Sequence, residues 1–95
     1  MIACKVDDNQ REIVKKLRKI PGVTVSITSA LGDGFPDIVV GYKGVNHLIE
    51  IKDGSKPPSR RKLTPAEGKF HGLWTGRVEI CNSFEEVLKT LNIKA

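Results

Sequence analysis

The stretch that decides the fold runs from Asp37 to Lys52 and reads DIVVGYKGVNHLIEIK. Its first part, to about Tyr42, is rich in β-branched residues and predicts a strand. Lys43-Gly44 is a turn signal, and the segment from His47 to Lys52 alternates as a second strand would. The whole stretch therefore predicts a β-hairpin.

Two charged side chains protrude from the otherwise apolar second strand of this hairpin. Period-two alternation places Glu50 and Lys52 on one face and Ile49 and Ile51 on the other. Asp37 opens the first strand, and the hairpin can bring it beside Glu50. Two carboxylates about 4 Å apart repel by about 4 kcal/mol at an effective dielectric constant of about 20. A divalent cation removes this repulsion, and oxygen ligands favour Mg²⁺ or Mn²⁺.

These residues suit phosphodiester hydrolysis. Asp37, Glu50 and the backbone carbonyl of Ile51 are the expected metal ligands, and the ion would polarise a phosphoryl oxygen and activate a water molecule. Lys52 would orient that water or stabilise charge on the phosphate. The alternative is a solvated Glu50–Lys52 surface pair with Asp37 as a turn residue, since such pairs are common and weak.

A helix and a strand are expected before the hairpin. The helix runs from about Asp8 to Ile20, with Gln10, Ile13, Val14 and Leu17 on one stripe, and Asp7 or Asp8 as its cap. Pro21-Gly22 ends it. The alternating segment 23–28 predicts a half-buried strand, and a turn-rich loop follows at 31–36.

A loop, a helix, a strand and a final helix are expected after the hairpin. Residues 53–62 contain Pro57-Pro58 and predict an exposed loop. The capping box at 64–67 begins a helix that ends near Gly76 and turns Phe70, Leu73 and Trp74 inward. Residues 77–81 predict a strand, and a second capping box at 83–86 opens the last helix.

Composition limits the class of protein. The chain has 95 residues and a formal net charge of +5, which favours one domain (1–95) and a polyanionic partner, either nucleic acid or an anionic membrane surface. No apolar run approaches the roughly 20 residues that cross a bilayer, and the first residues are no secretory signal, so a cytoplasmic location is expected. Cys4 and Cys81 are expected to be ordinary reduced thiols. So short a chain would gain buried surface by forming a homodimer.

The motifs together resemble a known family. Gly34-Phe35-Pro36-Asp37 followed by Leu48-Ile49-Glu50-Ile51-Lys52 resembles the PD-(D/E)xK nuclease superfamily. Lys52-Asp53-Gly54, Leu63-Thr64-Pro65-Ala66-Glu67, Phe70-His71, Trp74, Gly76 and Val78 narrow this to the virus-type replication-repair nuclease (VRR-NUC) domain, over about Asn9 to Leu91.

The resemblance implies an α/β restriction-endonuclease-like core in the order helix, three strands, helix, strand, helix, with a central mixed sheet flanked by helices. It also implies metal-dependent cleavage of DNA, often at branched or flapped structures, by a homodimer similar to Holliday-junction resolvases. A phage or prophage origin stays open, because the sequence does not indicate the organism. Two alternatives stay open: a nucleic-acid-binding module without catalysis, and an interaction subunit of a replication or repair complex.

One position departs from the family. Related enzymes often carry a metal-binding glutamate on the first helix, where this chain has Gln10, with Glu12 two residues later. Helical phase favours Gln10, because it lies on the core-facing stripe. An amide oxygen can hold a metal or its water but brings no charge, so Gln10 is included among the candidate catalytic residues.

The predicted DNA contact lies in the loop after the hairpin and on the second helix. These cations would neutralise phosphates without reading bases, so binding should depend on salt. The alternative is a solvated loop without a partner. The residues are Lys56, Arg60, Arg61, Lys62 and Lys69. Glu67, usually glutamine in the family, is most simply the capping partner of Thr64, and a role near the metal is the alternative for this position.

Overall fold

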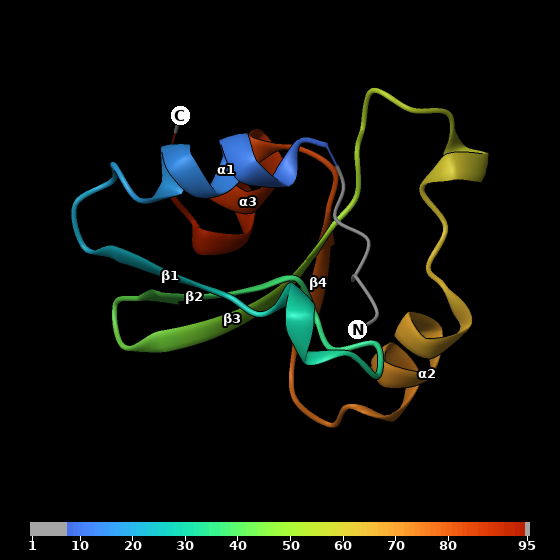
Figure 1. Ribbon diagram of the computed structural model, residues 1–95. Coiled ribbons are helices and arrows are strands. Elements are labelled where there is room, and N and C mark those ends of the chain that lie inside the picture. The colour runs from blue at the N-terminus through green and yellow to red at the C-terminus, as the bar shows by residue number, and fades with distance from the viewer. Residues whose placement is uncertain (1–7, 95) are drawn as a thin grey trace.

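The computed structural model describes residues 8–94 and has mixed α/β architecture, with a four-stranded mixed sheet and three α-helices (Figure 1). The expected order of elements is not matched in full, because two short 3₁₀-helices, η1 and η2, stand where loops were expected. The elements are α1 (Gln10–Leu17), β1 (Val23–Ile27), η1 (Ser29–Leu31), β2 (Ile38–Tyr42), β3 (Val45–Ile51), η2 (Pro58–Arg60), α2 (Pro65–Leu73), β4 (Val78–Cys81) and α3 (Phe84–Leu91).

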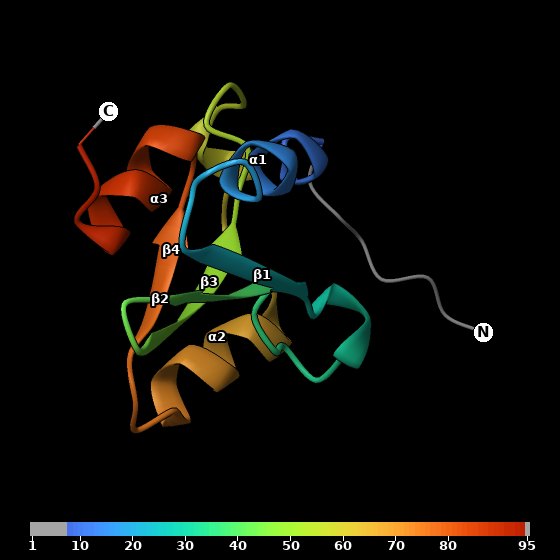
Figure 2. The ribbon, with the colours of Figure 1, turned by 90° about the vertical axis from the view of Figure 1, so that its left-hand side faces the viewer.

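The sheet has the strand order β1-β2-β3-β4. β1 pairs with β2 and β2 with β3 in antiparallel fashion, whereas β4 runs parallel to β3. A parallel neighbour needs a crossover connection, and the segment that contains α2 provides it. α1 and α3 lie together over one face of the sheet, and α2 lies on the other side (Figures 1 and 2).

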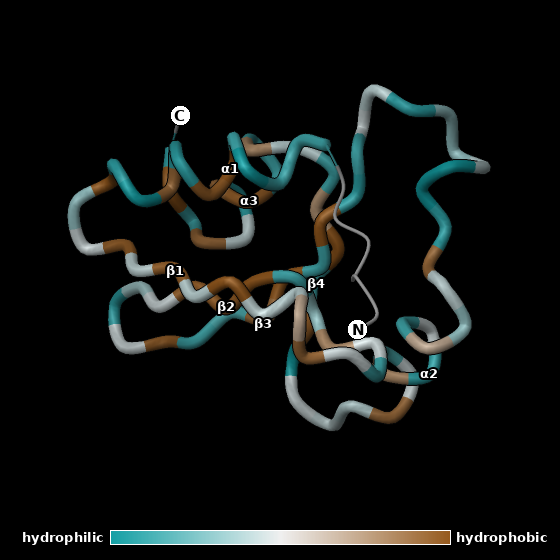
Figure 3. The backbone as a smooth tube through the Cα atoms, viewed as in Figure 1, coloured by the Kyte–Doolittle hydropathy of each residue, from teal (hydrophilic) through white to brown (hydrophobic). Residues whose placement is uncertain are grey.

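The hydrophobic core lies between the sheet and the α1–α3 pair. Figure 3 shows hydrophobic segments gathered where these two layers meet, while the chain between β3 and α2 is mostly hydrophilic. The expected stripe on α1 is confirmed, since Gln10, Ile13, Val14 and Leu17 are all buried. Other members of the core are Ile38, Val40, Ile49, Ile51, Cys81, Val87 and Leu91. Cys81 is a free thiol, and Cys4 lies outside the described residues.

Several local expectations were wrong. α2 ends at Leu73, and the side chains of Leu73 and Trp74 are exposed rather than turned inward, because α2 covers the sheet only in part. Asn9, not Asp8, is the N-cap residue of α1, without a side-chain capping bond; Asp7 lies outside the described residues. The second capping box is half formed: Ser83 Oγ accepts from the Glu86 N–H, but the Glu86 carboxylate accepts from the Asn82 N–H.

The register of the hairpin determines what faces what. Ile38 lies opposite Ile49, so the residues immediately before and after them, Asp37 and Glu50, are cross-strand neighbours. Ile38 and Ile49 both point into the α1–α3 core. Alternation therefore turns Asp37 and Glu50 toward the other face of the sheet, where α2 lies.

Candidate functional site

Asp37 is fixed at the point where β2 begins. Pro36, just before it, is fully buried, and the Thr28 N–H donates to the Asp37 carbonyl oxygen at 2.8 Å. The Asp37 side chain crosses to the neighbouring strand, where its Oδ2 accepts from the Ile51 N–H at 2.7 Å. The carboxyl group therefore has one orientation, set by β3.

Glu50 is the most deeply buried ionisable residue of the site, with 1 % of its surface exposed. Its Oε1 is buried and receives no hydrogen bond from the residues that the structure describes. Burial raises the pKa of Glu50 to about 10, helped by a hydrogen bond to Asp37 and by repulsion from Asp37 and Glu67. Burial also raises the pKa of Asp37, although hydrogen bonds from Glu50 and the Ile51 N–H oppose this shift. Without a bound metal ion, the raised pKa therefore favours the protonated form of Glu50, which can donate a hydrogen bond to Asp37.

Lys52 joins this pair from the end of β3. It is buried, with 8 % of its surface exposed, and its Nζ lies 3.7 Å from Glu50 Oε2. A closer partner is Glu67 on α2, whose Oε1 accepts from Nζ at 2.8 Å. The structure therefore brings Asp37, Glu50 and Lys52 together, as predicted, and adds a third carboxylate that the prediction left out of the site.

Glu67 has two functions in the structure. Its Oε1 also accepts from the Thr64 N–H at 2.8 Å, while Thr64 Oγ1 accepts from the Glu67 N–H, so the predicted capping box is confirmed. Burial alone would raise the pKa of Glu67, but hydrogen bonds from Lys52 and the Thr64 N–H outweigh it and lower the pKa. The local sequence pattern at Glu67 predicts the helix cap but not the contact with Lys52. That contact depends on how α2 docks against the sheet.

The loop before Asp37 helps to dock α2. Gly34 has φ of +77°, and a Cβ atom there would collide with the backbone of Ala66 in the first turn of α2. Next to it, the rings of Phe35 and Phe70 pack edge to face with their centroids 5.4 Å apart. The GxPD motif therefore supplies Asp37 and also seats the helix that carries Glu67.

The oxygen atoms of this site suit a hard divalent cation. Residues 8–94 contain no group of three or more His, Cys, Asp or Glu residues arranged to hold a metal. Asp37 and Glu50 supply two carboxyl groups, and the unpartnered Oε1 of Glu50 is what a bound cation would satisfy. The Ile51 carbonyl remains the predicted third ligand. Mg²⁺ commonly keeps several waters and uses only one or two carboxylates.

Gln10 is buried at the start of α1. Its Nε2 donates to Ser29 Oγ at 3.2 Å, and its Oε1 is buried without a hydrogen-bond donor among the described residues. The hydrogen bond to Ser29 does not connect Gln10 with Asp37 or Glu50, so its role at the metal stays a prediction. Glu12 points to solvent, with 70 % of its side chain exposed, and pairs with Lys16.

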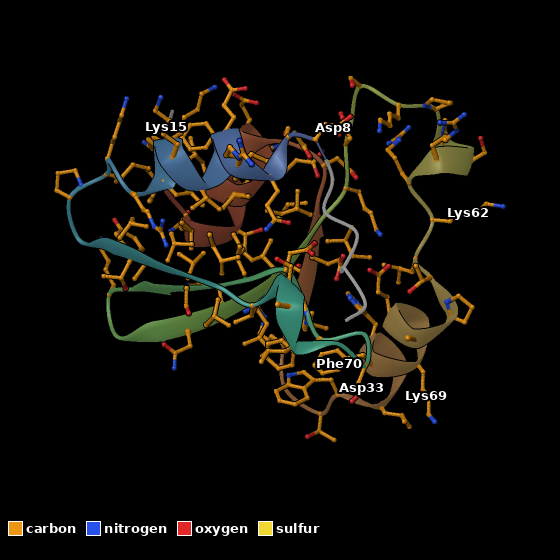
Figure 4. The ribbon with its side chains drawn as sticks, viewed as in Figure 1. Asp8, Lys15, Asp33, Lys62, Lys69 and Phe70 are labelled. Atoms are coloured by element: carbon orange, nitrogen blue, oxygen red, sulfur yellow. The ribbon has the colours of Figure 1, made fainter. Side chains whose placement is uncertain are left out.

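The predicted phosphate-binding cations have unequal surroundings. Arg60, Lys62 and Lys69 are exposed; Figure 4 shows Lys62 on the loop before α2 and Lys69 on the outer side of that helix. Lys56 forms an ion pair with Asp8 at 3.2 Å. Arg61 is half-buried, and its Nε is buried without a hydrogen-bond acceptor among residues 8–94. The exposed three are therefore best placed to meet phosphates.

Comparison of the chain with protein-family models, with curated proteins and with solved structures gave no match. Within residues 8–94, no helix has the length and apolar character needed to cross a membrane.

We predict that Glu50 makes the metal-free protein less stable as the pH rises. Its pKa is raised from 4.5 to about 10 on folding, so between these values the folded protein binds more protons than the unfolded chain. The free energy of unfolding should then fall with rising pH across this window. Urea unfolding in EDTA at pH 6 and pH 9 measures the fall, which should shrink in Glu50→Gln because an amide does not titrate.

Glu12→Gln is the matched control, because Glu12 is exposed, and it should keep the wild-type pH dependence. An unchanged pH dependence in Glu50→Gln would show that Glu50 ionises normally in the folded protein.

We also predict that Glu67 stabilises the fold beyond its capping function. Thr64→Ala removes the cap and should cost about 1 kcal/mol. Glu67→Ala also removes the nearer partner of a buried ammonium and should cost about 3 kcal/mol, near the lower end for broken buried pairs, since Glu50 remains beside Lys52. Denaturant unfolding of both variants measures the loss in free energy of unfolding. Equal losses would show that Glu67 contributes only as a helix cap.

Proposed function

We propose that this protein is a divalent-metal-dependent deoxyribonuclease of the PD-(D/E)xK superfamily, with a VRR-NUC-like domain. The observation that carries the proposal is the buried pair of Asp37 and Glu50 with the Lys52 ammonium beside it. A solvated surface pair, the alternative for these residues, does not fit residues that expose only 7 %, 1 % and 8 % of their surface. Burying three ionisable groups is unfavourable unless each is paired, protonated or bound to a cation.

The proposed mechanism assigns one task to each residue. Asp37, Glu50 and the Ile51 carbonyl would hold Mg²⁺ or Mn²⁺, and the ion, when bound, supplies Lewis acidity and a more acidic water. Binding of a cation requires Glu50 to lose the proton that it otherwise shares with Asp37. Lys52 stabilises negative charge that develops on the phosphate, or orients the attacking water, from a position set by Glu67. Gln10 would hold a metal-bound water through its amide oxygen.

DNA is the proposed substrate because of the charge distribution. The chain carries a net charge of +5, and Arg60, Lys62 and Lys69 extend from the loop and helix that follow the site. These cations suit a phosphate backbone and read no sequence. Branched DNA, such as a four-way junction, is proposed as the substrate on the basis of the resemblance. An intracellular location for the protein is proposed with it.

The resemblance also leads us to propose a homodimer, and exposed apolar side chains support it. Ile80 lies opposite Glu50 in the sheet and is 44 % exposed, while Leu73 and Trp74 on the same side are 69 % and 43 % exposed. A second copy of the chain would remove these side chains from water, which favours association.

Cleavage of labelled four-way, flapped and linear DNA in Mg²⁺ or Mn²⁺ tests the proposed activity. Lys52→Ala should lower the cleavage rate by about 10² to 10³-fold, the usual loss when a group that stabilises transition-state charge is removed. Lys43→Ala, at the turn on the opposite end of the hairpin, is the matched control and should cut as the wild type does.

Metal-dependent cutting that survives Lys52→Ala would point to a contaminating nuclease. DNA binding without cutting by the wild type would favour a non-catalytic binding module.

Sedimentation of the purified chain tests the homodimer. The wild type should sediment as a dimer, and Ile80→Lys should shift it toward the monomer, because an ammonium group in an apolar interface is costly to desolvate. Val45→Lys, at a residue 53 % exposed near the hairpin turn, should leave the dimer intact. A wild-type chain that sediments as a monomer at micromolar concentration would rule out the proposed dimer.

A further inference from the structure

The outer face of α1 carries an unusual concentration of positive charge. Five cations lie on or just after this helix, and two of them have partners: Lys16 pairs with Glu12 at 3.3 Å, and Arg18 donates to the Val25 carbonyl at 3.0 Å. The other three are exposed and form no hydrogen bond or ion pair with residues 8–94. We call these three, Arg11, Lys15 and Lys19, the α1 stripe.

The α1 stripe lines a single surface groove. The groove has a volume of about 460 Å³, and its walls also include Asp8, Glu12 and Lys16. Both acids in the groove are already neutralised, Asp8 by Lys56 and Glu12 by Lys16. Figure 4 shows Lys15 on the side of α1 that faces away from the sheet. The groove therefore presents net positive charge to solvent.

Helix stability explains only part of this arrangement. Lys15 lies in the last turn of α1, where the helix dipole favours a cation, but Arg11 lies at the other end. Residues four apart on a helix are neighbours, so Arg11 repels Lys15. Arg11 also lies in the first turn, where the positive end of the helix dipole disfavours a cation. Glu12 and Lys16 on the same helix show the stabilising alternative. A local arrangement that weakens its own helix is a sign of a functional surface.

The α1 stripe has a fixed position relative to the candidate active site. Asn9, immediately before α1, donates from Nδ2 to the Lys52 carbonyl oxygen at 3.1 Å. The Asp8–Lys56 ion pair joins the same end of α1 to the basic loop. These two contacts connect the start of α1 to the end of β3 and to the basic loop. Within α1 the rise from Arg11 to Lys15 is about 6 Å, close to two nucleotide steps of about 3.4 Å along one strand.

We propose that the α1 stripe is a second nucleic-acid contact, which binds successive phosphates of one DNA strand on the side of the sheet opposite α2. This inference rests on the proposed function and deepens it, because a contact besides the basic loop would let the protein hold more than one segment of a branched substrate. The ligand chemistry is that of phosphodiester groups, read without regard to base sequence.

The test compares two triple variants that remove equal charge. The first is Arg11→Gln/Lys15→Gln/Lys19→Gln, and the matched control is Lys43→Gln/Lys89→Gln/Lys94→Gln, at exposed positions on the hairpin turn and in or after α3. Each lowers the formal net charge from +5 to +2, because three cations become neutral. Fluorescence anisotropy with labelled four-way and linear DNA in EDTA measures binding without cleavage, and circular dichroism checks folding.

The α1-stripe variant should bind DNA at least about tenfold more weakly, and the slope of log K against log salt should fall by about 2 to 3, since each phosphate contact contributes about 0.9. The control should lose less than about threefold, with an unchanged slope. Equal losses in both variants would overturn the inference, since net charge alone would then explain them. The inference would also fail if the α1-stripe variant lost binding only to phosphatidylserine vesicles and kept its affinity for DNA.

The two proposals can fail separately. If the wild type cuts DNA and the two triple variants bind DNA equally well, the α1-stripe proposal fails and the nuclease proposal stands. If the wild type binds DNA through the α1 stripe but does not cut it, the nuclease proposal fails and the α1-stripe proposal stands.

Discussion

The contact between the carboxyl groups of Asp37 and Glu50 is the constraint on which the rest of the structure depends. The β2–β3 register makes these residues neighbours, and the Ile51 N–H fixes the Asp37 side chain. Two acids buried this closely cannot both be ionised without compensation. One keeps its proton, or a cation binds between them. The strands that build the core therefore also place two acids on the opposite face, where nearby positive charge would stabilise them.

Lys52 supplies part of that positive charge, and its ion pair with Glu67 connects the site to α2. No residue of α2 is buried, so this helix depends on its cap, on the Gly34 loop and on the ion pair to Lys52. Helix docking and the position of the Lys52 ammonium are thus coupled. A substrate that contacts α2 or the loop before it would act directly on the geometry around Lys52.

Acidic and basic side chains differ in how deeply they are buried. The acids of the candidate site are buried, whereas exposed cations that form no ion pair within residues 8–94 extend from α1, from the loop before α2 and from α2 itself. A polyanion would meet these outer cations first, and long-range attraction would raise its concentration near the site. A divalent cation at Asp37 and Glu50 would reverse the local sign and allow a phosphate to approach.

The sequence by itself determined the hairpin, the mixed α/β class, the core stripe of α1 and the grouping of Asp37, Glu50 and Lys52, because alternation and turn signals are local properties of the chain. Only the tertiary structure decided that Glu67 contacts Lys52, that Leu73 and Trp74 remain exposed, and that Gln10 bonds to Ser29. Periodicity shows which side chains share a face, but not whether another element covers that face. That depends on contacts between residues far apart in the chain, which no local pattern contains.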